Sequence, residues 1–349
     1  ISSNEIEINN NGKTENIHAE KIIIATGSTP TILPNIDIDE TQIVTSTGAL
    51  DLKKVPKKLI VIGAGVIGLE MGTVWRRLGS EVEVIEFLPR ILPGMDNEVA
   101  DKFMKILQKQ GIKFKLSHSL ESVKKVDGKV MLSIKDMDTN SLKQIDADVV
   151  LIAVGRKPNT SGLGLEELGL ATDKHGFIEI NNKFESSIKN IYAIGDVIKG
   201  PMLAHKAEED GVAAVEIING EAGHVDYNLV PGIIYTAPEV AVIGKTEEEL
   251  KNDGISYNKG VFPLTANSRA KAIGHTDGMV KILADKSTDK ILGAHMIGHE
   301  AGTVIHELSV AMGFGASSED VARICHGHPT VNEAIKEAAL ATYSKAIHS

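Results

Sequence analysis

The chain has 349 residues, of which 42% are hydrophobic, 24% charged and 4% aromatic. This length predicts two or three globular domains, and the composition excludes a disordered segment or a fibrous repeat. Asp and Glu outnumber Lys and Arg by 47 to 37, a net charge of −10 that argues against a general nucleic-acid or anionic-membrane binder. The single cysteine, Cys325, excludes an internal disulfide framework and a Cys-based zinc site. No apolar run is long enough to predict a transmembrane helix.

The first residues predict a hairpin followed by a strand. Alternating polarity in residues 5–8, the turn at residues 9–12 and the apolar run at residues 21–25 carry this prediction. A proline-bearing link over residues 30–34 then leads toward a new domain, which begins with the apolar strand at residues 59–62.

The next stretch alternates strands and helices, which predicts a parallel sheet. After the strand at 59–62 we expect a helix to about Leu78, a strand at 82–86, a helix at 96–110 and a strand at 113–116. A meander over 121–136 and a buried strand at 149–154 follow.

Residues 159–227 predict a short apolar strand at 191–194 followed by a helix at 204–219. The remaining segment predicts an α+β layer of antiparallel strands and helices. Its expected strands are 240–244, 256–262, 279–284 and 291–297, and its expected helices are 299–312, 318–324 and 331–346.

The strongest motif is Gly63-Ala64-Gly65-Val66-Ile67-Gly68, which follows the strand at 59–62 and opens a helix. In this context the first glycine allows a tight turn, the second lets a pyrophosphate approach the main chain, and the third lets helix and strand pack closely. Glu86 lies at the end of the second strand, where an acid hydrogen-bonds the adenosine ribose and repels a 2′-phosphate. The motif therefore predicts an NAD site; the alternative is a glycine turn without a ligand.

Two other strand ends carry weaker signals. Ala25-Thr26-Gly27 and Ile194-Gly195-Asp196 both place small or acidic residues where a cofactor could lie. Asp196 could accept hydrogen bonds from a ribose or polyol chain, or it could be an ordinary helix cap or turn residue.

The segment His326-Gly327-His328-Pro329-Thr330-Val331-Asn332-Glu333 suggests acid/base chemistry. Its histidines and Cys325 lack the spacing of a zinc site. With Thr330 as the N-cap of the next helix, Glu333 in the first turn can reach His328 and hold its imidazole in one tautomer. The alternative is a capping glutamate beside a surface histidine, and His326 is expected to be structural.

These motifs, taken in order, resemble the pyridine-nucleotide disulfide oxidoreductases and, within them, the dihydrolipoamide dehydrogenases. The resemblance extends from residue 1 to about 345 and rests on residues 25–28, 46–50, 61–70, 154–159, 193–196, 202–207 and 326–333. The runs at 202–207 and 267–270 favour this subfamily over the glutathione and mercuric reductases.

The resemblance implies an α/β fold, with Rossmann-like FAD- and NAD-binding domains and a C-terminal α+β dimerisation domain. In such a homodimer, FAD relays electrons between a dithiol and NAD. The residues implied for FAD are Thr26, Gly27, Ser28, Asp196, Met202, Leu203, Ala204 and His205. Those implied for NAD are Gly63, Ala64, Gly65, Val66, Ile67, Gly68, Leu69, Glu70, Glu86, Leu120 and Gly155. His328 would deprotonate dihydrolipoamide and Glu333 would orient it, reaching into the partner's active site.

One departure from the family pattern is large. Members begin with a FAD domain that carries its own glycine motif and a Cys-x4-Cys disulfide, and neither occurs in this sequence. We therefore expect residues 1–34 to be the end of a FAD domain, 35–157 an NAD-binding domain, 158–227 a central FAD-contacting domain and 228–349 the interface domain. Glu70 would lack the lysine that is its expected partner near the disulfide.

The resemblance implies oxidation of protein-bound dihydrolipoamide by NAD, with the lipoyl domains of 2-oxo-acid dehydrogenase complexes as partners, in the bacterial cytoplasm or the mitochondrial matrix. A second interpretation is an NAD-binding, dimerising fragment without turnover. A third is another NAD-linked disulfide reductase or a transhydrogenase on the same scaffold. No metal, nucleic acid or membrane is expected to be bound.

Overall fold

The computed structural model describes residues 2–348, and the chain divides into two compact units. The first contains the chain up to Thr31 together with Arg156–Val230, and the second contains Ile32–Gly155 and the chain from Pro231 onward. Each unit has its own hydrophobic core. The four predicted domains divide the chain differently, and their boundaries stay a prediction.

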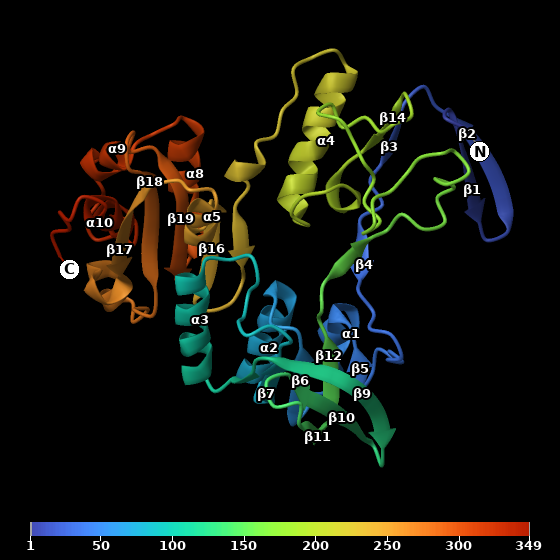
Figure 1. Ribbon diagram of the computed structural model, residues 1–349, viewed down its shortest axis with the longest axis horizontal. Helices are drawn as coiled ribbons and strands as arrows, with labels where there is room; N and C mark the ends of the chain where they lie inside the picture. The colour runs from blue at the N-terminus through green and yellow to red at the C-terminus, as the bar shows by residue number, and fades with distance from the viewer. Residues whose placement is uncertain (1, 349) are drawn as a thin grey trace. The chain divides into compact units, whose positions relative to one another are not determined.

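The first unit is built from short strands and one long helix (Figure 1). The predicted hairpin is present as β1 (Glu5–Asn10) and β2 (Lys13–His18). Two short pairings join its distant stretches: β3 (Ile22–Ile24) runs parallel to β14 (Ile191–Ala193), and β4 (Ser28–Pro30) runs antiparallel to β13 (Arg156–Pro158). The 3-10 turn η1 (Gly195–Val197) and helix α4 (Ala204–Ile218) follow β14.

The second unit contains the predicted parallel sheet, with strand order β5-β12-β6-β7-β8. Its strands are β5 (Ile43–Val44), β6 (Lys58–Ile62), β7 (Glu81–Ile85), β8 (Lys113–Lys115) and β12 (Val149–Ile152). Helices α1 (Ser46–Asp51), α2 (Val66–Arg77) and α3 (Asn97–Lys109) belong to the same part of the chain. The sheet order brings the ends of β12, β6 and β7 side by side.

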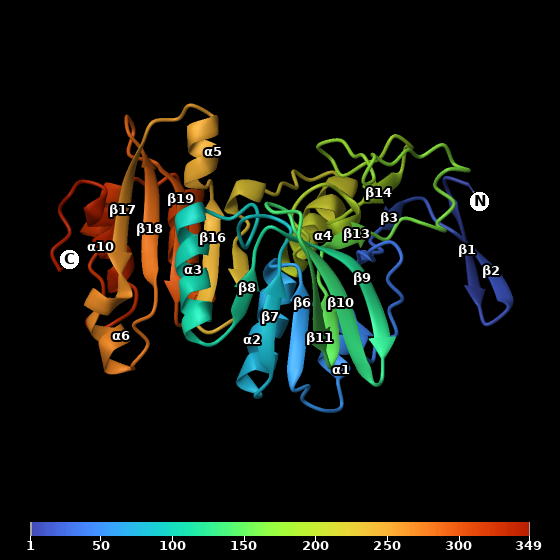
Figure 2. The same ribbon diagram turned by 60° about the horizontal axis from the view of Figure 1, so that its bottom comes forward.

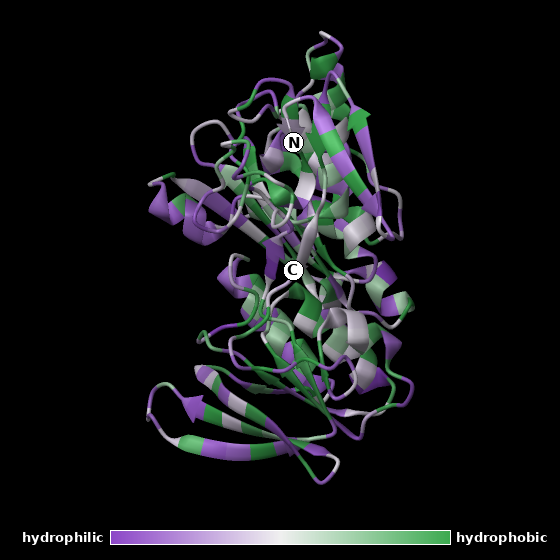
Figure 3. Ribbon diagram, turned by 90° about the vertical axis from the view of Figure 1, so that its right-hand side faces the viewer, coloured by the Kyte–Doolittle hydropathy of each residue, from purple (hydrophilic) through white to green (hydrophobic). Residues whose placement is uncertain are grey.

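Side-chain alternation along the parallel strands gives this sheet two buried faces. In β6, Leu59 and Val61 join the core with α2 and α3, whereas Ile60 and Ile62 join a second core on the other face. That second core is closed by the antiparallel meander β9 (His118–Val126), β10 (Lys129–Asp136) and β11 (Leu142–Ala147). Figure 2 shows this meander as a layer beside the parallel strands. Its strands, at the bottom of Figure 3, alternate between hydrophobic and hydrophilic residues, as expected for strands with one buried face.

The C-terminal part of the second unit is an antiparallel sheet with helices packed on it. Its strand order is β15-β16-β19-β18-β17. The strands are β15 (Gly232–Ile234), β16 (Glu239–Gly244), β17 (Tyr257–Pro263), β18 (Met279–Asp285) and β19 (Ile291–Gly298). The helices are α5 (Glu247–Asn252), α6 (Ser268–Ala272), α7 (Ala301–Val304), α8 (His306–Gly313), α9 (Ser318–Arg323) and α10 (Glu333–Ala341). The predicted α/β fold with a C-terminal α+β domain is thus confirmed.

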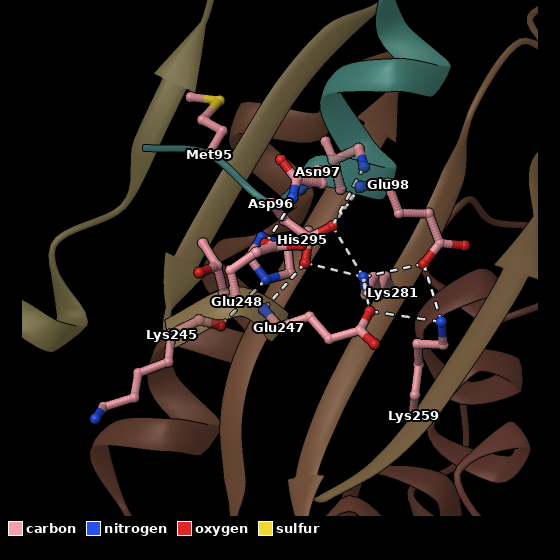
Figure 4. Close-up of polar contacts among 12 residues, drawn as sticks. Met95, Asp96, Asn97, Glu98, Lys245, Glu247, Glu248, Lys259, Lys281 and His295 are labelled. Atoms are coloured by element: carbon pink, nitrogen blue, oxygen red, sulfur yellow. Dashed lines mark hydrogen bonds and ion pairs between the residues drawn. The ribbon is translucent and has the colours of Figure 1, made fainter. Parts of the chain in front are cut away.

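A buried charge cluster joins the two sheets of the second unit (Figure 4). The Nζ atom of Lys281, on β18, lies 2.8 and 2.9 Å from the two carboxylate oxygens of Asp96. It also lies 2.6 Å from Oε2 of Glu247 and 3.0 Å from Oε2 of Glu98. Asp96 is itself the N-cap of α3, so one ammonium group ties the start of this helix to the C-terminal sheet.

Several elements differ from the sequence expectation. The helix predicted at 299–312 is two helices, α7 and α8, and the helix predicted at 331–346 covers only Glu333–Ala341. The strand β11 and the helices α1, α5 and α6 were not predicted. Helix α10 is also not capped by Thr330, because its N-cap is Asn332, which makes no side-chain cap bond.

Candidate active site

The glycine motif forms a tight turn between β6 and α2. Gly63 has φ +103°, and a Cβ atom at this position would lie 2.3 Å from the carbonyl oxygen of Ala153 on the neighbouring strand. A Cβ atom at Gly68 would lie 2.2 Å from the carbonyl oxygen of Gly63. Close packing of the backbone around Gly63 and Gly68 therefore leaves no space for a side chain at either position.

The middle glycine, Gly65, is not required by the backbone conformation or by packing within the protein. Its φ of −79° is accessible to any residue, and a Cβ atom there would meet nothing within 4 Å. Gly65 is also the N-cap of α2, with no side chain capping the free N–H groups of the first turn. Open space at an uncapped helix N-terminus fits the pyrophosphate of a dinucleotide.

Glu86 lies beside this turn, immediately after β7. Its carboxylate is 8% exposed and accepts hydrogen bonds from the backbone N–H of Ala64 at 2.7 Å and of Leu88 at 2.8 Å. Each oxygen keeps a second lone pair with which it can accept a ribose hydroxyl. The residues of the turn and Glu86 thus form one contiguous group, with the acid in the position expected for NAD recognition.

The remaining residues predicted for NAD lie around the same sheet. Gly155 follows β12, next to β6, and has φ +116°. Leu120 lies on β9 and packs against the core on the meander side. Glu70 lies on α2 and accepts a hydrogen bond from the Tyr235 N–H at 2.7 Å; burial raises the pKa of this carboxyl above its ordinary value despite that bond.

The residues predicted for FAD gather in the first unit. Because β3 and β14 are parallel, the segments that follow them, Thr26–Ser28 and Asp196, lie at the same end of the pair. The Ser28 hydroxyl donates to Asp196 at 2.5 Å, and Arg156 donates from Nε to that hydroxyl at 2.7 Å. The Thr26 hydroxyl donates to the carbonyl oxygen of Asn159 at 2.7 Å.

A buried ion pair holds the main chain beside Asp196. Nζ of Lys206 lies 2.7 Å from Oδ2 of Asp210, and both side chains are fully buried. Lys206 donates to the carbonyl oxygen of Gly195, while Asp210 accepts from its N–H, so both backbone groups of this glycine are fixed. Tyr227 completes the set by donating its hydroxyl to Asp210 at 2.8 Å.

The other four residues predicted for FAD lie where α4 begins. Met202 and Leu203 precede the helix, Leu203 is its N-cap without a side-chain cap bond, and Ala204 and His205 are in its first turn. Helix α4 packs against η1, so these residues belong to the same region as Asp196.

The predicted histidine–carboxylate pair is present near the C-terminus. Nδ1 of His328 lies 2.9 Å from Oε1 of Glu333. Glu333 also accepts from the Thr330 N–H at 2.9 Å. Burial alone would raise the pKa of Glu333, but the bonds from Thr330 and His328 hold its pKa below the ordinary value. The carboxylate therefore stays ionised and orients the imidazole with Nδ1 as the donor.

His326 has a separate role. Its Nε2 lies 2.7 Å from Oε1 of Glu307, and the side chain is nearly buried, in keeping with the structural role expected of it. Within residues 2–348, no three His, Cys, Asp or Glu side chains are grouped as metal ligands. No helix among these residues is long and apolar enough to span a bilayer.

Sequence reasoning missed three groups of this site. Arg156 and Asn159, which hold Ser28 and Thr26, fall inside the Val154–Asn159 motif, so the motif itself was their signal. The Lys206–Asp210 spacing of four residues on one helix was a further signal. No sequence signal predicted the pairing of Glu337 with His348, because this contact depends on how the C-terminal tail folds back onto α10.

Comparison with known proteins gives the class. Residues 2–211 match the pyridine nucleotide-disulphide oxidoreductase family, and residues 230–339 match the dimerisation domain of that family. The chain therefore belongs to the pyridine nucleotide-disulphide oxidoreductases, whose chemistry uses FAD and NAD. The match to the dimerisation domain supports a homodimer.

More specific similarities are found among curated proteins and solved structures. The chain is 56% identical to dihydrolipoyl dehydrogenase 1, mitochondrial, of Arabidopsis thaliana, over all of this chain and 69% of the relative. It is 56% identical to mitochondrial dihydrolipoyl dehydrogenase of Dictyostelium discoideum, over 99% of this chain and 71% of the relative. The Cu(II) complex of the flavoprotein disulfide reductase RclA from Escherichia coli superposes with a TM-score of 0.89 at 27% identity, over 97% of this chain and 76% of that chain.

Proposed function

We propose that this chain is the NAD-binding and dimerising part of a dihydrolipoyl dehydrogenase, which oxidises protein-bound dihydrolipoamide with NAD to give lipoamide, NADH and a proton. The observation that carries the proposal is the His328–Glu333 hydrogen bond at 2.9 Å, in a chain 56% identical to two dihydrolipoyl dehydrogenases. In such an enzyme, bound FAD supplies the electron relay between the dithiol and NAD.

In this proposal the nucleotide-binding residues are Gly63–Glu70, Glu86, Leu120 and Gly155. The support is geometric: the open position at Gly65, the uncapped first turn of α2 and the carboxylate of Glu86 lie together. A carboxylate at this position accepts the ribose hydroxyls of NAD and repels the 2′-phosphate of NADP.

Thr26, Gly27, Ser28, Asp196 and the start of α4 would contact FAD. Asp196 is half-buried and held by the Ser28 hydroxyl, and the adjacent Gly195 is fixed by the Lys206–Asp210 pair. A fixed acceptor of this kind suits the hydroxyl groups of a ribityl or ribose chain.

His328 would act as the general base toward the dithiol substrate. Glu333 fixes the proton on Nδ1, so Nε2 is left as the acceptor for the S–H proton. The thiolate produced, and not the thiol, is the nucleophile in thiol–disulfide exchange. This proton transfer leaves an imidazolium that the Glu333 carboxylate stabilises.

The same proposal covers the domains, partners and location. The four domains would be residues 1–34, 35–157, 158–227 and 228–349. The partners would be a second copy of the chain and the lipoyl domains of 2-oxo-acid dehydrogenase complexes. Because both curated relatives named above are mitochondrial proteins, the location would be the mitochondrial matrix.

The test is a steady-state assay of NADH formation by the FAD-loaded, full-length enzyme that contains this chain; the same enzyme is used in the activity experiments below. Lipoyl domain carrying dihydrolipoamide, free dihydrolipoamide and an unrelated dithiol are compared, with NAD and NADP as acceptors. We expect kcat/KM to be highest for the lipoyl domain with NAD. An equal or higher value for the unrelated dithiol would instead favour a different disulfide reductase, and transfer from NADH to a nucleotide analogue without any dithiol would favour a transhydrogenase.

A further inference from the structure

We propose that a second histidine–carboxylate pair, His348 with Glu337, sets the pH at which the His328–Glu333 pair takes up its proton. This inference rests on the proposed function of His328 as a base. It assigns to the last residues of the chain an electrostatic role in the dithiol reaction.

The second pair is built like the first, but from the C-terminal tail. Nδ1 of His348 lies 2.7 Å from Oε1 of Glu337. The other oxygen of Glu337 accepts from the backbone N–H of Ile347 at 2.7 Å and of His348 at 3.3 Å. The Glu337 side chain is 7% exposed, whereas that of His348 is 67% exposed. A buried carboxylate thus holds the tail against α10 and presents an imidazole that solvent can protonate.

Both pairs face the same hollow. Glu333 and Glu337 are four residues apart on α10 and therefore share one face of the helix. A cavity of about 170 Å³ is lined by both acids and by both of their histidines. The two pairs also interact electrostatically. Burial raises the pKa of Glu333, but the bonds from Thr330 and His328 lower it, and the charge of His348 makes a smaller contribution in the same direction.

The other charged groups of the cavity are already engaged. Lys336 donates to the carbonyl oxygen of Ile324 at 3.1 Å, and His326 is paired with Glu307 outside the His328–Glu333 pair. The Glu337–His348 pair carries one negative charge when its imidazole is neutral and no net charge when the imidazole is protonated. The net charge of the Glu337–His348 pair therefore contributes to the electrostatic field at the imidazole of His328.

Replacement of His348 and replacement of Glu337 should move the acid limb of the pH–rate profile in opposite directions. His348→Asn leaves the Glu337 carboxylate uncompensated, which favours protonated His328 and moves the midpoint of the acid limb to higher pH. Glu337→Gln removes the negative charge of the pair, which makes protonated His328 less favourable and moves the midpoint to lower pH. For charges several ångströms apart across a solvated cavity, each shift should be about 0.3–0.5 pH unit, and 0.5 M salt should reduce both shifts.

The experiment measures kcat/KM for dihydrolipoamide against pH in the FAD-loaded enzyme, for wild type, His348→Asn, Glu337→Gln and the double variant. The glutamine keeps an acceptor oxygen for the Ile347 N–H, so the tail can stay in place. His299→Asn is the matched control, because His299 is half-exposed and lies 3.7 Å from a carboxylate outside this cavity; its midpoint should equal that of wild type.

A midpoint for His348→Asn above that for Glu337→Gln, with wild type between the two, supports the inference. Shifts in the same direction would indicate a loosened tail and overturn it, as would unchanged midpoints. His328→Gln in the same assay separates the two levels of the argument. If that variant keeps near-normal turnover, the proposed function fails; if it is inactive while the His348 and Glu337 variants leave the profile unchanged, only this inference fails.

Discussion

His328 has one ring nitrogen engaged and the other available. Nδ1 is bound to Glu333 at 2.9 Å, and within residues 2–348 the two-thirds exposed side chain has no other pairing. We expect His328→Gln in the FAD-loaded enzyme to lower turnover by about 10²–10⁴-fold, the contribution of general acid/base catalysis, with bound flavin unchanged. Stopped-flow and steady-state rates with dihydrolipoamide measure this.

Glu333→Gln should reduce turnover less than His328→Gln, because the amide can still orient the ring but cannot stabilise its cation. The carboxylate has a lowered pKa in the folded protein. A group of this kind stabilises the fold above its unfolded pKa of about 4 and loses that contribution as the pH falls below it. Denaturation midpoints of wild type and variant should therefore converge as the pH falls below about 4, whereas a constant difference would contradict the shift.

Glu86 gives a separate prediction, on coenzyme preference. The N–H groups of Ala64 and Leu88 bind different oxygens of Glu86, so Glu86→Gln keeps an acceptor for only one of them. The substitution also removes the charge that repels a 2′-phosphate. The ratio of NADP to NAD dissociation constants, measured by calorimetry, should fall relative to wild type. Glu81, an exposed acid at the start of the same strand, provides the control as Glu81→Gln. An unchanged ratio in Glu86→Gln would remove this residue from the nucleotide site.

At the scale of the element, two glycines of the β6–α2 turn have different roles: Gly63 is needed for the fold, and Gly65 is expected to leave space for the nucleotide. Gly63→Ala should destabilise the fold, because it places a Cβ atom at positive φ and 2.3 Å from a carbonyl oxygen. Gly65→Ala should leave the melting temperature nearly unchanged and weaken NAD binding, because its Cβ atom meets no protein atom and would occupy the space of the pyrophosphate. Thermal unfolding and NAD titration of both variants are the measurements. Tight NAD binding by Gly65→Ala would contradict the assignment.

The Lys281 cluster joins three elements, β18, α3 and α5, and predicts a large effect from a small change (Figure 4). Asp96→Asn keeps a good N-cap for α3 but removes one of the three carboxylates around the fully buried Lys281, at a cost of about 1.5–3 kcal/mol. Burial would raise the pKa of Asp96, but the Lys281 ammonium outweighs burial and holds it below its ordinary value. The difference from wild type in urea unfolding should hence be full near pH 7 and shrink as the pH falls below about 4.

The control for this prediction is an exposed ion pair in the same unit. Lys53 and Asp51 lie 2.6 Å apart with both side chains about four-fifths exposed, so Asp51→Asn should change the unfolding free energy by less than about 1 kcal/mol. If Asp96→Asn and Asp51→Asn changed the unfolding free energy equally, burial would not explain the contribution of the Lys281 cluster to stability.

Elements with a strong periodicity were predictable from sequence, and those defined by distant pairing were not. The strands β6 and β12 contain continuous apolar runs because both faces of the sheet are buried, and the glycine turn is local in sequence. By contrast, β4 and β13 are three residues each and exist only because they pair with each other. The break between α7 and α8 at Ile305 likewise depends on packing.

The same distinction holds within the candidate site. His328 and Glu333 are five residues apart, so a local argument could bring them together. The Thr330 cap was wrong because the Thr330 hydroxyl donates to the carbonyl oxygen of Gly327 at 2.7 Å, and the helix begins only at Glu333, with Asn332 as its N-cap. Lys281 lies on β18, whereas its partners lie at the start of α3 and on α5, and no local pattern brings these segments together.

At the scale of the whole molecule, residues 1–349 should bind NAD but not turn over dihydrolipoamide. The nucleotide residues lie within one unit, whereas Cys325 alone cannot form an intrachain disulfide. A polypeptide of these residues should show NAD binding by calorimetry, dimeric mass by light scattering and no dihydrolipoamide-dependent NADH formation. Stoichiometric bound FAD with substantial turnover would contradict this.

The first unit is made of two stretches of chain that are far apart in sequence and are therefore synthesised at different times. Strand β3 is complete once Ile24 has emerged, but its parallel partner β14 begins only at Ile191. Until then the edge of Ile22–Ile24 that pairs with β14 stays open, while the intervening parallel sheet can already form. Because long-range strand pairing is slow and exposes aggregation-prone edges, this short strand is where we expect chaperones to act during synthesis.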